Sequence, residues 1–404
     1  MPQVVVIGGG AAGFFAAIRA AELGAQVLLL EKTGKTLAKV RISGGGRCNL
    51  THNCADPATL ATHYPRGGAE LLPAFARFGQ PETLAWFAAR GVRAVAEADG
   101  RMFPHTNQAE TVATCLEQAA RQAGVSLRLS TGVSALEPRP GGGYTVQTTA
   151  GPLEADRVIV ATGGAPKAEG MAWLARLGLE VVPPVPSLFT FNLPGSGPLQ
   201  ALAGVSVPAG EVALPQLKDA RRGPLLVTHW GLSGPGVLRL SAWQARALAE
   251  AGYQTPVLVN WLGQKPASVL KMLKTLREAN PKKRLANLPV PGLPRRLQDY
   301  TLQASQLPET LTTSEAGNRH LEQWAQALCQ DKHLLQGKTT YKDEFVTAGG
   351  IALHQVDFAT MEARSLPGLH LCGEVLDVDA ITGGFNFQAA WTTGWLAGTA
   401  AAQV

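Results

Sequence analysis

Cysteine is scarce in this sequence. The chain has five cysteines in 404 residues, and no two of them are spaced as C-x-x-C. An odd count without such pairs argues against a disulfide framework and against a structural zinc site. We therefore expect neither disulfide bonds nor a bound metal. The five residues are Cys48, Cys54, Cys115, Cys329 and Cys372.

Long apolar runs are also missing, and no basic segment precedes the first apolar residues. A membrane-spanning helix needs about 20 consecutive apolar residues, and a secretory signal begins with positive charge. These absences predict a cytoplasmic protein without membrane contact. Internal repeats and low-complexity tracts are absent too, which argues against a solenoid or a disordered chain.

The composition is that of a globular protein, because 46% of the residues are hydrophobic. At this length we expect two or three domains with large buried cores. The net charge of +6 allows an anionic partner such as a nucleotide or RNA without requiring one. The oligomeric state cannot be read from these properties.

The first residues predict a strand, a turn, a helix and a second strand. Val4–Ile7 and Val27–Leu30 are continuous apolar runs, as in parallel strands that are buried on both faces. Between them, Phe14–Leu23 has the alanine-rich composition and apolar spacing of a helix. This order is the start of a Rossmann fold.

The turn of this unit carries the pattern G-x-G-x-x-G as Gly8, Gly10 and Gly13. The first glycine permits a tight turn, the second lets the backbone approach a pyrophosphate, and the third lets the helix lie close to the strand. Glu31 ends the second strand, where an acidic side chain binds an adenosine ribose. The alternative is a glycine-rich turn in an unrelated parallel sheet.

The segment ISGGGRCNLTHN, residues 42–53, favours a flavin dinucleotide over a nicotinamide dinucleotide. It follows the second strand almost directly, where the chain of FAD enzymes folds back along the cofactor. On this interpretation Gly44–Gly46 are glycines because side chains would collide with the cofactor. Arg47 would offset cofactor charge and Asn49 would bind a ring edge. The alternative is a surface loop with an incidental arginine.

Two later segments support the same site. After a short antiparallel piece at Tyr144–Thr148, the apolar run Val158–Val160 predicts a buried strand that ends in the turn ATGG, residues 161–164. Leu369–Cys372 predicts another strand, and a helix should begin near Asn386. Ligands of open parallel sheets bind at the carboxyl ends of the strands. The two ends of the chain are therefore expected to build one site.

The motifs resemble a known family. The segments KVRISGGGRCNLTHN, GRMFPHTNQAETV and THWGLSGPGVLRLS, together with the last segment from VTAGGIALHQ to GFNFQAAWTTGWLAG, occur in this order over nearly the whole chain. They are similar to the BaiN/RdsA-type FAD-dependent oxidoreductases, including the aminoacetone-oxidase-like members. The resemblance implies an FAD-dependent oxidoreductase.

The family fold implied is α/β: a glutathione-reductase-like FAD-binding Rossmann domain with an inserted β-barrel-like domain and a small helical subdomain. We place the first part of the FAD domain at residues 1–187 and its second part at 346–404. The inserted domain is expected at 188–263, its helical subdomain at 264–331 and its return strand at 332–345.

The resemblance also implies a set of FAD contacts. Val133 is included by position alone, as a strand residue whose main chain would pair with the adenine. Related flavoproteins often have Asp where this chain has Glu374, whose side chain is longer by one methylene group. The contacts are Gly8, Gly10, Ala12, Gly13, Glu31, Lys32, Arg41, Ser43, Gly45, Arg47, Asn49, Val133, Gly163, Gly373, Glu374, Gly384, Asn386 and Phe387.

The helical subdomain is expected to be basic. Nine Lys and Arg residues between Lys265 and Arg296 are opposed by Glu278 and Asp299 alone. Such a cluster could bind nucleic-acid phosphates by releasing counterions. A solvated helical face is the favoured alternative, because only Tyr300 interleaves with the charge.

Three residues are candidates for proton transfer. They are Cys48 in the glycine segment, His105 in FPHTNQ and His229 in THWGLSGP. For Cys48 the alternative is a small buried residue beside the cofactor, and for each histidine it is a hydrogen-bonded structural role. Trp230 would line a substrate pocket or belong to the core.

Three functions stay open at this point. The first is NAD(P)H-driven reduction of an activated C=C bond, including uracil of ribosomal RNA to dihydrouridine, although GRMFPHTNQA has no cysteine to act as the acid. The second is oxidation of a small amine by oxygen. The third is a non-catalytic RNA-binding factor with structural FAD. A second G-x-G-x-x-G after a strand is absent, so NAD(P)H would have to reach the flavin directly.

Overall fold

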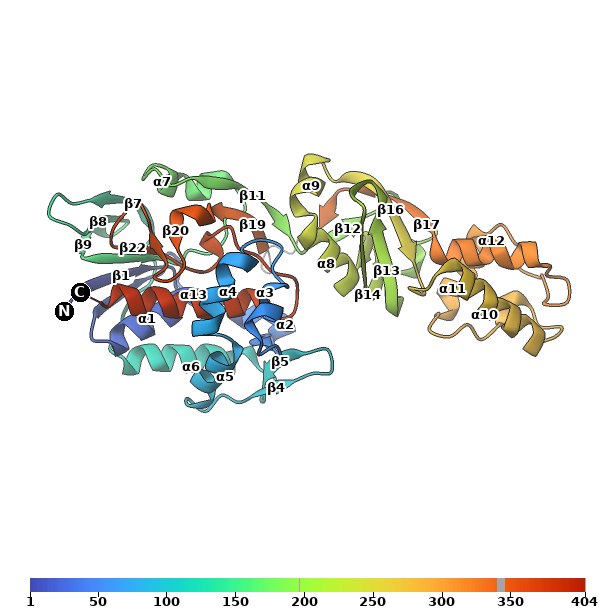
Figure 1. Ribbon diagram of the computed structural model, residues 1–404, viewed down its shortest axis with the longest axis horizontal. Helices are drawn as coiled ribbons and strands as arrows, with labels where there is room; N and C mark the ends of the chain where they lie inside the picture. Colours follow the sequence, from blue (N-terminus) through green and yellow to red (C-terminus); the bar gives the residue numbers. More distant parts are fainter. Residues whose placement is uncertain (196, 340–345, 404) are drawn as a thin grey trace. The chain divides into compact units, whose positions relative to one another are not determined.

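The computed structural model describes residues 1–195, 197–339 and 346–403 (Figure 1). The chain forms two compact units. One comprises Met1–Ser187 together with Lys342–Val404, and the other comprises Leu188–Tyr341. Among the described helices, none is both long enough and apolar enough to cross a membrane.

A mainly parallel sheet forms the centre of the first unit. Apolar runs with burial on both faces give its inner strands, so Val5 lies opposite Leu28 on one side and Val158 on the other. The predicted strands at Val4–Ile7, Val27–Leu30 and Val158–Val160 are confirmed, and the one predicted at Leu369–Cys372 ends at Leu371. In sheet order the strands are β20 (Val356–Asp357), β21 (Glu362–Ala363), β22 (Leu369–Leu371), β10 (Arg157–Val160), β1 (Gln3–Ile7), β2 (Gln26–Leu30) and β6 (Ser126–Arg128).

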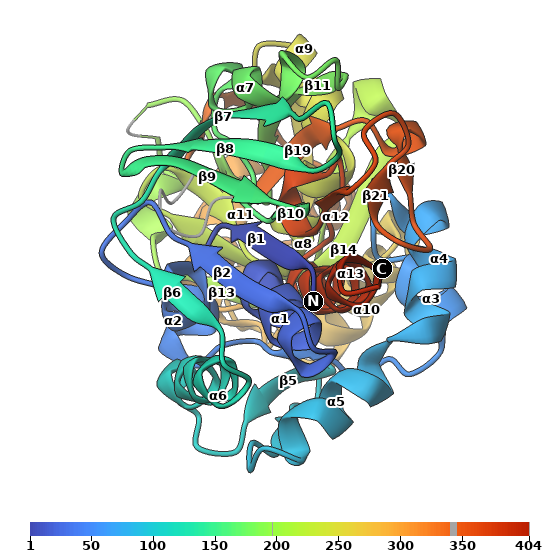
Figure 2. The ribbon, with the colours of Figure 1, turned by 90° about the vertical axis from the view of Figure 1, so that its left-hand side faces the viewer.

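Helices cover one side of this sheet and a small antiparallel sheet covers the other, as Figures 1 and 2 show. The helices are α1 (Ala11–Glu22), α6 (Ala109–Gln122) and α13 (Phe385–Ala401). The small sheet consists of β7 (Val133–Pro138), β8 (Tyr144–Thr148) and β9 (Gly151–Ala155). This is the predicted α/β arrangement of a Rossmann domain.

Helices α1 and α13 bring the two ends of the chain together. Small residues allow their close approach, because a Cβ on Gly394 would lie 2.5 Å from the Ala12 carbonyl oxygen. A Cβ on Gly398 would lie 2.3 Å from the Ala16 carbonyl oxygen. The N-terminal turn and the start of α13 therefore belong to one packed layer.

The segment between β2 and β6 adds helices and a small sheet. Its elements are α2 (Ala38–Gly46), β3 (Thr51–His52), α3 (Pro57–Ala61), α4 (Gly68–Arg77), α5 (Gln80–Ala88), β4 (Ala94–Ala96) and β5 (Arg101–Pro104). After β10 the chain forms η1 (Ala168–Met171), α7 (Ala172–Ala175) and β11 (Val181–Ser187). β11 pairs antiparallel with β19 (Val346–Ile351).

The second unit contains a curled antiparallel sheet. The sheet order begins with β17 and ends with β18, which only Gly337 separates along the chain, so the two edges of the sheet are adjacent as in a barrel. In sheet order the strands are β17 (Asp331–Gln336), β16 (Gln254–Asn260), β13 (Ser206–Leu214), β14 (Asp219–Thr228), β15 (Gly231–Ser233), β12 (Thr190–Asn192) and β18 (Lys338–Thr339). Residues 340–345 of the predicted return strand lie outside the described residues.

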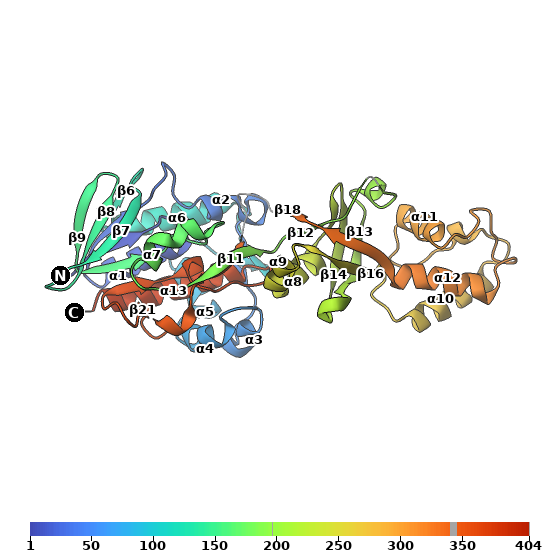
Figure 3. The same ribbon diagram turned by 90° about the horizontal axis from the view of Figure 1, so that it is seen from above.

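Helices accompany this sheet. Helices α8 (Pro235–Trp243) and α9 (Ala245–Glu250) follow β15, whereas α10 (Pro266–Ala279), α11 (Arg295–Ala304) and α12 (Asn318–Cys329) group together beyond one end of the strands (Figure 3). Trp324 of α12 is fully buried in this group, and its Nε1 donates to Thr301 Oγ1 at 3.1 Å. The predicted helical character of the segment from residue 264 is confirmed.

Candidate functional site

In the glycine turn between β1 and α1, the packing of the chain leaves no room for a side chain at Gly8 and Gly13, whereas it leaves room at Gly10. A Cβ on Gly8, whose φ is +113°, would lie 2.4 Å from the Ala161 carbonyl oxygen. A Cβ on Gly13 would lie 1.9 Å from the Gly8 carbonyl oxygen. A Cβ on Gly10 would meet nothing within 4 Å, and the backbone of Gly10 is extended. The space beside Gly10 therefore fits a ligand that approaches the backbone.

This open space lies at the N-terminus of α1. Gly10 is the N-cap of the helix and, having no side chain, offers no side-chain hydrogen bond to the first turn. The first amide N–H groups of a helix lack internal partners, and together with the helix dipole they favour a phosphate. A dinucleotide pyrophosphate has the charge and the acceptor oxygens that this turn suits.

Glu31 fastens the turn to the end of β2. Its Oε2 accepts a hydrogen bond from the Gly9 amide at 2.9 Å, and its Oε1 accepts from the Thr33 amide and from Thr33 Oγ1, both at 2.8 Å. The predicted contact of Glu31 with a ribose stays a prediction. The predicted adenine contacts lie nearby, since a Cβ on Gly132, which precedes Val133, would lie 3.8 Å from Lys32 Cβ.

The segment from Ser43 to Gly46 interrupts a helix. Residues 38–42 are helical, Ser43 is extended with ψ 150°, and Gly44, Gly45 and Gly46 have φ values of 58°, 69° and 82°. The helix therefore runs up to the glycines. A Cβ on Gly44 would crowd Phe103 at 3.0 Å, whereas Cβ atoms on Gly45 and Gly46 would face open space. Positive φ is thus a reason for glycine at all three positions.

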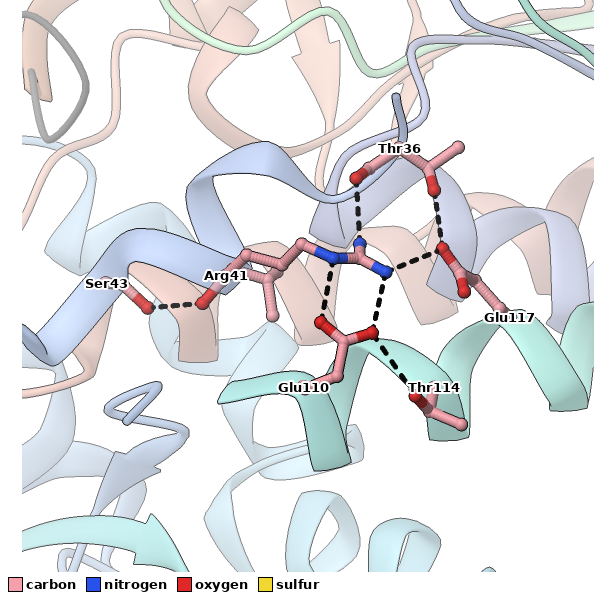
Figure 4. A network of polar contacts seen from close by, with 7 residues as sticks. Thr36, Arg41, Ser43, Glu110, Thr114 and Glu117 are labelled. Carbon is pink, nitrogen blue, oxygen red and sulfur yellow. Dashed lines mark hydrogen bonds and ion pairs between the residues drawn. The ribbon is translucent and has the colours of Figure 1, made fainter. Parts of the chain in front are cut away.

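Arg41 and Ser43, two predicted FAD contacts, make hydrogen bonds within the chain (Figure 4). The Arg41 guanidinium donates to both carboxylate oxygens of Glu110, to Glu117 Oε1 and to the Thr36 carbonyl oxygen. Burial alone lowers the pKa of Arg41, but the bonds to Glu110 and Glu117 outweigh it, so the pKa is raised. The network ties α2 to α6 just before the glycines.

The charge of Arg47 is also offset within the chain. Its Nη1 donates to Glu97 Oε1 at 2.7 Å, and its guanidinium lies 3.9 Å from the centre of the Phe103 ring. Arg101 donates to the other oxygen of the same carboxylate at 2.9 Å. The structure therefore gives Arg47 a partner other than the expected cofactor charge.

Asn49 joins the N-terminal segment to the start of α13. In the amide orientation that satisfies both of its groups, the side-chain nitrogen donates to the Thr51 carbonyl oxygen at 3.1 Å, and the side-chain oxygen accepts from the Gly384 amide at 3.0 Å. Thr51 Oγ1 donates to Gln388 of α13 at 2.6 Å. A Cβ on Gly384 would lie 2.5 Å from the Thr51 carbonyl oxygen. The two chain ends therefore form one surface.

A buried polar atom lies near the carboxyl ends of β10 and β22. Thr347 Oγ1 has no hydrogen-bond partner among the described residues, and a Cβ on Gly164, the neighbour of Gly163, would lie 2.5 Å from it. Glu374 accepts from the Thr347 amide at 2.9 Å and from Lys39 Nζ at 2.8 Å. A buried hydroxyl without a partner is costly, which fits a ligand that supplies one.

Gly373, Asn386 and Phe387 are held by neighbours in the same layer. Gly373 has φ +74°, and its amide donates to Thr393 Oγ1 of α13 at 2.9 Å. The Asn386 side chain accepts from the Ala380 amide at 2.9 Å and donates to the Ala380 carbonyl oxygen at 3.2 Å. Phe387 stacks on Trp391, with ring centres 5.6 Å apart. The loop before α13 is thereby fixed.

The three candidates for proton transfer differ in exposure. Cys48 is fully buried, and burial raises the pKa of its thiol to about 12, despite the hydrogen bond with Ser43. His105 is exposed just after β5, and His229 is exposed in the second unit beside Trp230, which is 66% exposed. The burial of Cys48 argues against a reactive thiolate.

Sequence reasoning missed a cluster of rings at the start of α13. Phe385 lies between two half-buried histidines, with ring-centre distances of 4.5 Å to His52 and 4.3 Å to His63. His52 Nδ1 lies 3.0 Å from the Gly383 carbonyl oxygen, and the Ile381 amide donates to the His63 carbonyl oxygen at 3.0 Å. The position of His52 within the glycine segment was the only available signal.

Comparisons with known proteins agree with this architecture. The HI0933-like protein Rossmann domain model matches residues 2–400. The 3-dehydro-bile acid delta(4,6)-reductase of Clostridium scindens is 32% identical over 414 positions, which cover 100% of both chains. The ribosomal RNA dihydrouridine synthase of Escherichia coli is 30% identical, with 97% of this chain and 96% of the relative covered.

A solved structure shows the same fold. The 3-ketosteroid-delta4-(5alpha)-dehydrogenase of Rhodococcus jostii has a TM-score of 0.54 and 16% identity, and the match covers 100% of this chain and 97% of that chain. Given this fold, the site at the glycine turn and a family model that matches almost every residue, the chain belongs to the HI0933-like family of FAD-dependent oxidoreductases of the BaiN/RdsA type.

Proposed function

We propose that this protein catalyses the NAD(P)H-driven reduction of a C=C bond that is conjugated to a carbonyl group. The observation that carries the proposal is the match to two relatives along nearly the whole chain. Their names describe the reduction of a double bond or the reduced product. One is named as a reductase of a bile-acid double bond, and the other as a synthase of dihydrouridine in ribosomal RNA. The chemistry common to both is addition of hydrogen across an activated double bond.

The residues of the first unit fit FAD. The turn at Gly10 and the amides at the start of α1 would hold the pyrophosphate. Residues 43–46 and the loop before α13 would line the flavin, and Thr347 would supply a hydroxyl. When bound, FAD supplies two-electron transfer through the flavin ring.

The proton is the part of the reaction that a side chain can supply. In the net reaction NAD(P)H gives up a hydride, and the substrate C=C bond gains a hydride and a proton. Cys48 is unsuited because its thiol is buried and its pKa is raised to about 12. We infer that the imidazole of His63 delivers the proton, because its half-buried ring stacks on Phe385 at the start of α13.

Ribosomal RNA uridine is the substrate that we propose. The name of the E. coli relative supports it, as does the concentration of positive charge in residues 264–300. With a ribosomal RNA substrate, we expect the protein to act in the cytoplasm. The name of the C. scindens relative favours a second candidate, a steroid-like enone.

Half-reactions of the purified protein test the proposal. Under anaerobic conditions NADPH or NADH should bleach the flavin absorbance, and ribosomal RNA fragments should restore it. Mass spectrometry of the RNA should then show uridines that have gained two hydrogen atoms. If a steroid enone restores the flavin absorbance and RNA does not, the second candidate is the substrate. Bleaching by a small amine, with peroxide formed in air, would replace the reductase with an oxidase.

A further inference from the structure

The positive charge of the chain is concentrated in one segment of the second unit. Residues 264–300 contain nine of the 36 Lys and Arg residues and only two of the 30 Asp and Glu residues. The segment therefore has a net charge of +7, and the rest of the chain has −1, against +6 for the whole. The surplus charge of the protein thus lies almost entirely on α10, α11 and the loop between them.

Intramolecular ion pairs leave this charge largely uncompensated. Of the nine basic side chains, only Arg295 pairs with a carboxylate among the described residues, that of Asp299. Arg277 donates to the Ala316 carbonyl oxygen, and Lys283 donates to Asn280 Oδ1 at 2.9 Å. These partners are neutral and leave the positive charge in place.

Cations with exposed or half-buried side chains lie at the start of α10, along it and on the loop that follows it. α10 buries Val269 and Leu273 and packs against α12, while Lys271 is exposed. Lys274, half-buried and three residues further on, shares the face of the helix with Lys271. The loop then presents three consecutive exposed cations. We call the set Lys265, Lys271, Lys274, Lys282, Lys283 and Arg284 the cationic surface.

The cationic loop is held in a defined conformation. The Thr313 amide donates to the Lys283 carbonyl oxygen at 2.7 Å, and Thr313 Oγ1 donates to the Asn280 carbonyl oxygen at 2.7 Å. Lys282 has φ +66°, a left-handed conformation that favours glycine. The side chains of the loop are therefore displayed from a fixed backbone, which lowers the entropy cost of binding a partner.

The surface lacks the features of a membrane-binding face. Such a face needs large apolar side chains beside its cations. In the part of the chain that the structure describes, none of the exposed large hydrophobic residues lies in residues 264–300. Tyr300, the only aromatic residue of the segment, directs its hydroxyl to Asp331 at 3.1 Å. Cations without apolar or stacking partners suit a partner whose binding groups are phosphates.

We propose that the cationic surface docks RNA through its phosphates and without reading the base sequence. The choice of RNA rests on the proposed function, while the phosphate chemistry rests on the charges. Choice of the target uridine would then belong to the FAD unit, and the cationic surface would supply affinity. Such binding depends steeply on salt, because each phosphate contact releases counterions.

A pair of matched triple variants tests the surface in the full-length holoenzyme. Lys282→Gln, Lys283→Gln and Arg284→Gln together remove three charges from the cationic surface. Arg93→Gln, Arg121→Gln and Lys218→Gln remove three exposed charges from elsewhere. Binding of a fluorescent ribosomal RNA fragment is measured against salt. The cationic-surface variant should lose on the order of 10- to 100-fold in affinity at low salt, and its salt slope should fall by about 2.

The control variant should bind RNA as the unchanged protein does. Equal loss in both variants would overturn the proposal, because net charge alone would explain it, and no loss in either would overturn it too. Loss of binding to anionic lipid vesicles with RNA binding retained would assign the surface to membranes instead. Flavin bleaching by NADPH should be the same in all variants. If the cationic-surface variant loses RNA binding as expected but the unchanged protein reduces no uridine, the RNA-docking proposal is retained and the proposed substrate is rejected.

Discussion

Arg41 and Glu110 form a two-point ion pair: Nε and Nη2 of the arginine each lie 3.0 Å from a carboxylate oxygen of the glutamate. Arg41 comes from α2 and Glu110 from the first turn of α6. Arg41 lies three residues before Gly44, the first of three left-handed glycines, and Figure 4 shows its contacts. Arg41 thereby ties the segment before the glycines to α6.

The first prediction separates positioning by Arg41 from direct contact with FAD. Arg41→Lys keeps the charge but loses the two-point geometry. We expect FAD to bind on the order of tenfold more weakly, and the free energy of unfolding to fall by no more than about 1 kcal/mol, because the pair is partly exposed. Titration of the apoprotein with FAD measures the affinity.

Glu110→Gln supplies the control for Arg41. If Arg41 acts through Glu110, the two substitutions should not add, so Arg41→Lys should change FAD affinity little in the Glu110→Gln background. Full additivity would mean that the guanidinium contacts the cofactor directly.

The second prediction concerns two glycines of the same turn. Gly10→Ala places a methyl group in open space on an extended backbone, so the apoprotein should keep its unfolding free energy to within about 1 kcal/mol. FAD affinity should nevertheless fall at least about tenfold, because the methyl group occupies the pyrophosphate space. Gly13→Ala instead forces a contact with the Gly8 carbonyl oxygen and should destabilise the apoprotein by about 3 kcal/mol. Equal FAD affinity in Gly10→Ala and the unchanged protein would refute the assignment.

The third prediction is that the Cys48 thiol takes no part in the reaction. Burial raises the pKa of this thiol to about 12, so almost no thiolate forms near neutral pH. We expect Cys48→Ala to retain flavin bleaching by NADPH and reduction of the substrate. In the folded protein Cys48 should resist iodoacetamide, while the partly exposed Cys54 reacts faster. Loss of substrate reduction with normal FAD content would return Cys48 to the mechanism.

Local sequence patterns predicted most of the fold and part of the candidate site. Apolar runs such as Val4–Ile7 predicted strands because both faces of a parallel strand are buried. G-x-G-x-x-G predicted the turn because Gly8 and Gly13 meet backbone atoms that any such turn brings close. The partners of Arg41 and Arg47 could not be predicted. Glu110 and Glu97 are 69 and 50 residues away, and only the tertiary fold brings them into contact.

The ring cluster around Phe385 was missed for the same reason. His52 and His63 flank α3 near the start of the chain, whereas Phe385 lies near its end, and their stacking depends on how the loop before α13 packs. Conversely, His105 and His229 lie in motifs that attract attention, yet both side chains are exposed. Sequence position alone does not distinguish a histidine in a site from one at the surface.

The fourth prediction tests His63 as the proton donor. His63→Gln should slow reoxidation of the flavin by the substrate on the order of 100-fold, while bleaching by NADPH stays unchanged, because only the second half-reaction requires that proton. His105→Gln is the matched control and should affect neither step, since its ring is exposed. An unchanged rate would exclude His63.

The fifth prediction is a dependence of stability on pH through His370. This residue of β22 is 3% exposed, and its Nδ1 lies 2.9 Å from the Thr360 carbonyl oxygen. Burial lowers the pKa of His370 below its ordinary value of 6.5, against the opposing effects of the Thr360 bond and of Glu362. Between the lowered pKa and 6.5, the unfolded state binds more protons than the folded state, so stability rises with pH.

His370 thus contributes stability that is present above pH 6.5 and is lost as the pH falls through its lowered pKa. His370→Asn keeps a donor near Thr360 but cannot titrate. Denaturant unfolding of both proteins from about pH 7.5 to about pH 5.5 measures the difference in unfolding free energy. We expect the advantage of the unchanged protein to shrink towards the acid end, because protonation of the unfolded His370 then favours unfolding. Two parallel curves would show that the imidazole titrates equally in both states, and burial at β22 would then carry no pH dependence.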